Sequence, residues 1–146
     1  MVIRQLSVFL ENQAGKLVEV TGCLCREGIN IRALNVAEAT DYGVLRLIVD
    51  HTDEAAEILK RQGYIFSVTQ VVSCAVPDEV GGLHKLLCLL SESGFNIEYM
   101  YSVFGRDDGL AYMIFRVPNP EELEQSLKDN NVISSGKHRL GPETQE

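Results

Sequence analysis

Apolar residues change their spacing repeatedly along the first half of the chain. Leu6, Val8 and Leu10 recur every second residue, which is typical of a half-buried strand. Leu17 and Leu24 fall instead on one face of a helix. The spacing predicts a strand, a helix, two strands, a helix and a short strand over residues 3–10, 17–28, 29–37, 44–50, 52–63 and 64–69.

The second half repeats this order of elements. Leu83, Leu86 and Leu90 form an apolar stripe at helical spacing. Strands are predicted over residues 71–76, 95–104 and 110–117, helices from Leu83 and Asn119, and a short last strand at Val132 and Ile133. The residues that follow are polar, and we expect a frayed tail there.

One offset of 66 positions relates the two halves. Residues 15–31 match residues 81–97, including two glycines and the asparagine that follows the second glycine. No gap is needed from residue 11 to residue 50, so that Leu45 aligns with Ala111. A chance match would not keep glycine, asparagine and apolar positions in phase together, and we infer an internal duplication.

The duplicated order of elements predicts an α+β fold of two tandem ferredoxin-like βαββαβ modules. Each module has an antiparallel four-stranded sheet with both helices on one face. We expect the first module over residues 1–69, the second over 70–135 and a polar tail over 136–146. Because a module of ~65 residues has a thin core and one open sheet face, we also expect self-association, as a homodimer.

The turn between the first strand and first helix of each module carries the best candidate binding chemistry. Glycine lets a ligand approach the backbone, and the free amides at a helix start favour a carboxylate. Asn12 in the first turn and Asp78 in the second can accept an ammonium group. Ordinary helix capping explains the same residues, and this alternative stays open. The candidate residues are Asn12, Gln13, Ala14, Gly15, Lys16, Leu17, Asp78, Glu79, Val80, Gly81, Gly82 and Leu83.

A short motif surrounds the first helix of each module. It reads Asn-x-x-Gly-x-Leu or Asp-x-x-Gly-x-Leu before the helix, and Gly-Ile-Asn-Ile or Gly-Phe-Asn-Ile after it. The motif resembles that of the ACT domain, and the resemblance covers residues 1 to about 133. It implies allosteric, regulatory modules that bind amino acids at interfaces between modules. It also adds four residues to the candidate binding site: Asn30, Ile31, Asn96 and Ile97.

The two turns depart from the family pattern in different ways. Ala14 and Val80 stand where many family members have proline before the glycine. Asp78 replaces the asparagine of the first turn, and its negative charge favours an ammonium group but disfavours a carboxylate. We therefore expect two unequal sites.

Composition narrows the classes of function. The 146 residues include 13 basic and 21 acidic side chains, and the net charge of −8 disfavours nucleic acid as a partner. No run approaches the ~20 apolar residues of a membrane span, so we expect a cytoplasmic protein that binds no membrane. The four cysteines lack paired spacing and are predicted to be free thiols that fill the core. His51, His84 and His138 lack metal-ligand spacing, so we expect no metal and no cofactor.

Several functions fit a fold of this kind. The duplicated turn and the lack of a nucleophile–base pair favour a non-catalytic sensor of a free amino acid, which regulates a separate enzyme or pathway. An RNA-binding module needs aromatic residues on its central strands, but residues 3–10 contain only Phe9 and residues 71–76 none. An acylphosphatase-like enzyme needs an arginine in the first turn, which neither turn contains. A protein–protein interaction module without a ligand is a further alternative.

Overall fold

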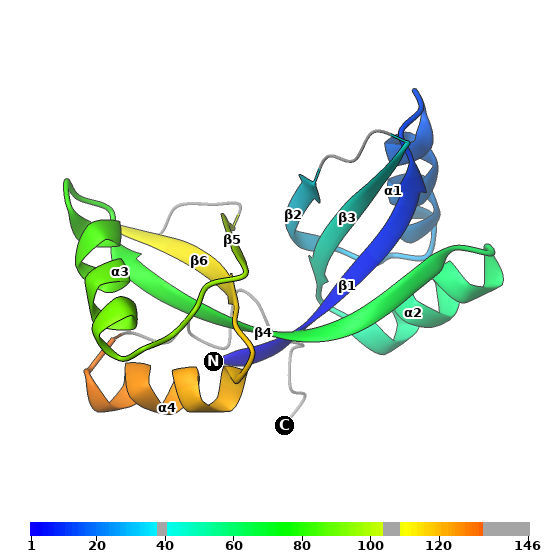
Figure 1. The fold of residues 1–146 in the computed structure, drawn as a ribbon. Coiled ribbons are helices and arrows are strands. Elements are labelled where there is room, and N and C mark those ends of the chain that lie inside the picture. Colours follow the sequence, from blue (N-terminus) through cyan, green and yellow to red (C-terminus); the bar gives the residue numbers. More distant parts are fainter. Residues whose placement is uncertain (38–40, 104–108, 133–146) are drawn as a thin grey trace. The chain divides into compact units, whose positions relative to one another are not determined.

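The computed structural model describes residues 1–37, 41–103 and 109–132. The helices and strands, labelled in Figure 1, are β1 Val2–Glu11, α1 Lys16–Arg26, β2 Ile31–Ala37, β3 Tyr42–Val49, α2 Thr52–Arg61, β4 Ile65–Pro77, α3 Gly82–Glu92, β5 Tyr99–Ser102, β6 Leu110–Arg116 and α4 Pro120–Asp129. The strands are hydrogen-bonded in the order β2-β3-β1-β4-β6-β5. The α+β class and the tandem ferredoxin-like modules are thus confirmed.

The chain divides into two compact units. The first unit contains residues Arg4–Thr69, and the second contains Met1–Ile3 together with the residues from Gln70 onward. Strands β1 and β4 each contribute residues to both units. The strands predicted at 64–69 and 71–76 form the single strand β4. Gln70 lies between them, and unlike proline it keeps the backbone amide that a strand needs for its hydrogen bonds.

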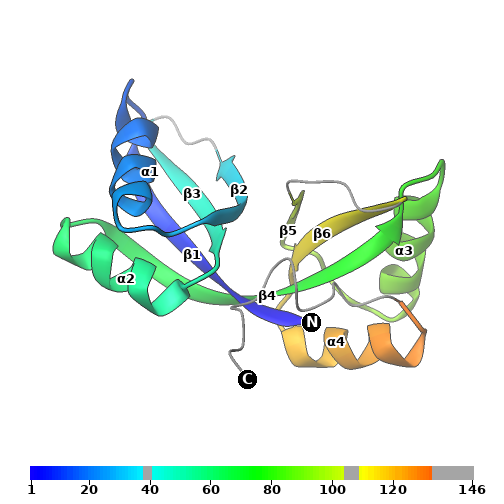
Figure 2. The ribbon, with the colours of Figure 1, turned by 180° about the vertical axis from the view of Figure 1, so that it is seen from behind.

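In the first unit, both helices cover one face of the sheet (Figure 2). Leu6 of β1 lies opposite Leu47 of β3, and both side chains are fully buried. Leu24 of α1 and Leu59 of α2 pack into the same cluster. Burial of a leucine of this kind contributes roughly 1.5–3 kcal/mol, so this shared face holds the two helices on the sheet.

The second unit has a core of the same design. Cys74 of β4 lies opposite Met113 of β6, and the cluster also contains Leu90 of α3 and Leu123 of α4. Figure 2 shows α3 and α4 together on one side of β4 and β6. Of the apolar stripe predicted at Leu83, Leu86 and Leu90, the last two residues are buried in this cluster, whereas Leu83 is exposed.

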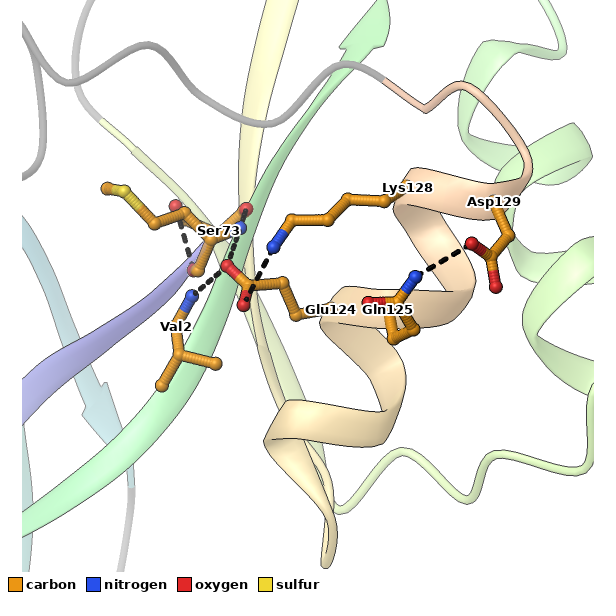
Figure 3. A network of polar contacts seen from close by, with 7 residues as sticks. Val2, Ser73, Glu124, Gln125, Lys128 and Asp129 are labelled. Carbon is orange, nitrogen blue, oxygen red and sulfur yellow. Dashed lines mark hydrogen bonds and ion pairs between the residues drawn. The ribbon is translucent and has the colours of Figure 1, made fainter.

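The N-terminal residues complete the sheet of the second unit. The Met1 ammonium group donates to the carbonyl of Ser73 at 2.7 Å, and the Ser73 amide donates to the carbonyl of Met1 at 2.9 Å. Glu124 of α4 accepts a hydrogen bond from the amide of Val2, as Figure 3 shows. The prediction of a last strand at Val132 is wrong, since Val132 follows α4 outside any strand. Ile133 and the tail lie outside the described residues.

The offset of 66 between the two units holds only as far as the second hairpin, which joins β5 to β6 in the second unit as β2 joins β3 in the first. Leu6 pairs with Leu47, whereas Val72, which is 66 positions after Leu6, pairs with Phe115, which is 68 positions after Leu47. The prediction that the repeat needs no gap to residue 50 is therefore wrong. The second hairpin is two residues longer, and its residues 104–108 lie outside the described ranges. A shift of two keeps every side chain on its face, which is why the apolar pattern conceals it.

Candidate functional site

The first candidate turn leads from β1 into α1. Gly15 has a φ of 91°, which an L residue rarely adopts, and its carbonyl accepts the amide of Glu19 at 2.9 Å. The amide of Lys16 donates to the carbonyl of Gln13 at 3.3 Å. No side chain caps α1, so the amides of Leu17 and Val18 in its first turn lack a partner inside the helix.

The second candidate turn repeats this geometry between β4 and α3. Gly81 has a φ of 88°, and its carbonyl accepts the amide of Lys85 at 2.9 Å. Side-chain capping is again missing, and the amides of Leu83 and His84 lack a partner inside the helix. The ordinary capping explanation, in which Asn12 or Asp78 caps the helix, finds no hydrogen bond in either turn as the structure describes it.

The second turn is tighter than the first. A Cβ atom on Gly82 would lie only 2.2 Å from the carbonyl oxygen of Pro77, so that position accepts glycine alone. The equivalent position in the first turn is Lys16, whose side chain is partly buried. The turns therefore share a backbone path and differ in what lies beside it.

Each turn also carries one exposed ion pair. The Lys16 ammonium lies 3.2 Å from a carboxylate oxygen of Glu19, and this hydrogen bond raises the pKa of Lys16. In the second turn Lys85 lies 3.3 Å from Glu79. A zwitterionic ligand could exchange either pair for its own two charges at little cost, because exposed pairs contribute less than about 1 kcal/mol.

The residues that follow the first helix of each module lie away from the turn. Helix α1 has 11 residues, which places Asn30 and Ile31 roughly 16 Å from Gly15, at the other end of the helix. The backbone amide of Asn30 donates to Asp50 at 3.0 Å. Asn96 and Ile97 follow α3 in the same way. Within one module the turn residues therefore lie together, but Asn30 or Asn96 lies too far away to contact the same small ligand.

A cavity in the second unit begins at its candidate turn. Its volume is about 330 Å³, within the lower range of small-molecule sites, and Glu79 and Gly82 belong to its lining. Sequence reasoning did not find the other residues of this lining. Three of them, Lys85, Leu86 and Leu89, follow Gly82 at helical spacing, and this periodicity was the available signal.

The cysteines divide into two kinds. Cys23 and Cys74 are buried, as predicted for core thiols, and burial raises the pKa of the Cys74 thiol to about 12. The prediction is wrong for Cys25 and Cys88, which are exposed because they lie on the solvent faces of α1 and α3. Among the residues that the structure describes, no three metal-ligating side chains come together. His138 lies outside those residues.

Comparison with known proteins places this geometry in a family. The family described as ACT domain pair matches residues 1–137. Protein BT0572 from Bacteroides thetaiotaomicron has a solved structure that is 40% identical, covers 96% of each chain and gives a TM-score of 0.88. The chain belongs to the ACT domain pair family, and the resemblance inferred from the two motifs is confirmed. ACT domains are regulatory modules, and the family match indicates no catalytic family.

Two more distant structures share the fold. The ligand-free regulatory subunit of aspartate kinase from Thermus thermophilus is 16% identical over 88% of this chain and 94% of its own, with a TM-score of 0.63. The corresponding subunit from Thermus flavus is 13% identical over 88% and 94%, with a TM-score of 0.60. At this identity the likeness concerns the fold alone. In the part of the chain that the structure describes, no helix has the length and apolar character needed to span a membrane.

Proposed function

We propose that this protein is a non-catalytic sensor of a free amino acid, which acts in the cytoplasm and regulates a separate enzyme. The observation that carries the proposal is the duplicated turn, in which two helix-start amides stand beside a left-handed glycine in each unit. Such amides bind a carboxylate, and Asn12 or Asp78 would accept the ammonium group of the same ligand.

A complete site requires more than one module. Because Asn30 and Gly15 lie at opposite ends of α1, a ligand that contacts both kinds of residue must lie between two modules. The second module comes either from the same chain or from a second copy. We therefore propose a homodimer as the binding-competent form, with an amino acid at a module interface.

The neighbours support a regulatory role of this kind. Two of the solved structures that share the fold are regulatory subunits of aspartate kinase. By analogy, the ligand would shift the equilibrium between two states of this protein, and a partner enzyme would distinguish those states.

Calorimetry against the twenty amino acids tests the proposal. A ligand at 100 times its dissociation constant should stabilise the protein by about 2.7 kcal/mol, and the unfolding temperature should rise accordingly. The same amino acid in N-acetylated form, which lacks the ammonium group, serves as the matched control and should give little shift. If none of the twenty raises the unfolding temperature, the proposed function is wrong.

A further inference from the structure

We infer that the cavity of the second unit holds the side chain of an apolar amino acid, and that the first unit lacks this subsite. This inference rests on the proposed function and specifies its ligand. The second turn then selects the ligand by its side chain, while the first turn binds only the ligand's carboxylate and ammonium groups.

The chemistry of the cavity wall defines the class of ligand. Val76, Leu86 and Leu89 provide its apolar part, and Leu86 is 5% exposed. Glu79 and Lys85, paired at 3.3 Å, supply its charged part next to the candidate turn. A zwitterion would place its carboxylate near Lys85 and the amides of Leu83 and His84, and its ammonium group near Glu79.

The first unit shows why the subsite is confined to the second. Tyr64 follows Gly63, whose φ is 79°, and its amide donates to the carbonyl of Leu59 at 3.0 Å. Val132 follows Asn131, whose φ is 55°, and its amide donates to the carbonyl of Leu127 at 2.9 Å. Tyr64 and Val132 are therefore equivalent positions, 68 residues apart like α2 and α4.

The larger side chain occupies the corresponding space in the first unit. Tyr64 packs against the core cluster that contains Val20 and Cys23, which are the equivalents of Leu86 and Leu89. Burial raises the pKa of the Tyr64 hydroxyl, as do the nearby Cys23 and Glu19. In the second unit, the smaller valine stands where the first unit has tyrosine. The smaller side chain of Val132 leaves the volume of about 330 Å³ open beside it.

The size and polarity of this volume favour leucine, isoleucine, methionine or valine. Each of these side chains would be stabilised by burial against the apolar wall. A lysine or aspartate side chain would lose its hydration there without gaining a partner, because Glu79 and Lys85 bind the ligand's own charged groups. Serine and glycine would leave most of the cavity unfilled.

Isothermal titration of the intact protein with each of these amino acids tests the inference. We expect an apolar amino acid to bind most tightly, and Val132→Tyr to weaken it at least tenfold by filling the cavity as Tyr64 does. Val68→Tyr adds the same ring to a side chain that is 41% exposed in the first unit, and it should leave the affinity unchanged. Circular dichroism checks that both variants fold.

The possible outcomes separate this inference from the proposed function. Tight binding of serine or lysine, with no response to Val132→Tyr, would overturn the inference and leave the proposed function standing. Binding of no amino acid would overturn both. If Val132→Tyr fails to fold, Leu89→Trp narrows the same cavity from the partly exposed face of α3, and unchanged affinity for leucine in that variant contradicts the inference.

Discussion

The backbone amide of Val2 donates to a carboxylate oxygen of Glu124 at 3.1 Å, across 122 positions of the sequence. This hydrogen bond fastens the first residues of the chain to the last helix of the second unit (Figure 3). The Lys128 ammonium lies 3.2 Å from the same carboxylate and keeps it in place. Together with the two hydrogen bonds between Met1 and Ser73, the Val2–Glu124 hydrogen bond holds the start of β1 beside β4.

Removing this carboxylate should weaken the second unit. Glu124→Ala takes away the acceptor of the Val2 amide, and we expect a loss of about 1–2 kcal/mol in the free energy of unfolding. Glu124→Gln keeps an acceptor oxygen and should lose less. Urea unfolding measures both. Equal stability of the wild type and Glu124→Ala would show that the N-terminal residues are not held in this way.

The same carboxylate predicts a pH dependence. Burial alone raises the pKa of Glu124, but hydrogen bonds from Lys128 and Val2 outweigh it and lower the pKa below its usual value of 4.5. The unfolded chain thus binds the proton more tightly than the folded one, and the stabilisation is lost as pH falls below 4.5. The wild type should lose more stability than Glu124→Gln between pH 5 and pH 3, because only the wild type carries this titrating group. Parallel losses would contradict the prediction.

The two kinds of cysteine should react at different rates. Cys25 and Cys88 are exposed, and a thiol reagent should modify both in the folded protein at pH 7. Cys74 should stay unmodified, since a thiol with a pKa of about 12 forms almost no thiolate and is also shielded from the reagent. Mass spectrometry after brief labelling distinguishes the sites. Rapid labelling of Cys74 would show that β4 opens readily.

Three glycine substitutions should differ in sign and size. Gly82→Ala places a Cβ atom 2.2 Å from the Pro77 carbonyl, so the turn must shift, at a cost of about 3 kcal/mol. Gly15→Ala has space but keeps a φ of 91°, which costs roughly 1–2 kcal/mol. Gly22→Ala, inside α1, should stabilise by about 0.5–1 kcal/mol. Thermal unfolding ranks them, and any other order would contradict this account of the turns.

Most of the fold was predictable because its signals are local. The period-two spacing of Leu6, Val8 and Leu10 identifies β1, since alternate residues of a strand share a face. The glycines at 28 and 94, with φ of 77° in both units, end the first helix of each module where the sequence predicted. The duplicated motif identified the two turns for the same reason.

The candidate site was predictable only in part. The turn residues are neighbours in sequence, and the backbone joins them directly. The subsite that we propose depends on Val132, which lies some 50 positions after the turn and resembles any apolar residue at the end of a helix. Its role can be inferred only by comparison with Tyr64, and the two positions are recognised as equivalent only when the register shift of two residues is known.

The sequence by itself determined the elements, their duplication and the face that each element buries. These properties depend on the spacing of apolar residues over a few positions, which is visible in the sequence alone. Only the tertiary structure decided that Met1–Ile3 belong with the second unit and that β4 is one strand. Which strands pair is decided by hydrogen bonds and buried surface between segments that are distant in sequence, and the local spacing of apolar residues does not determine this.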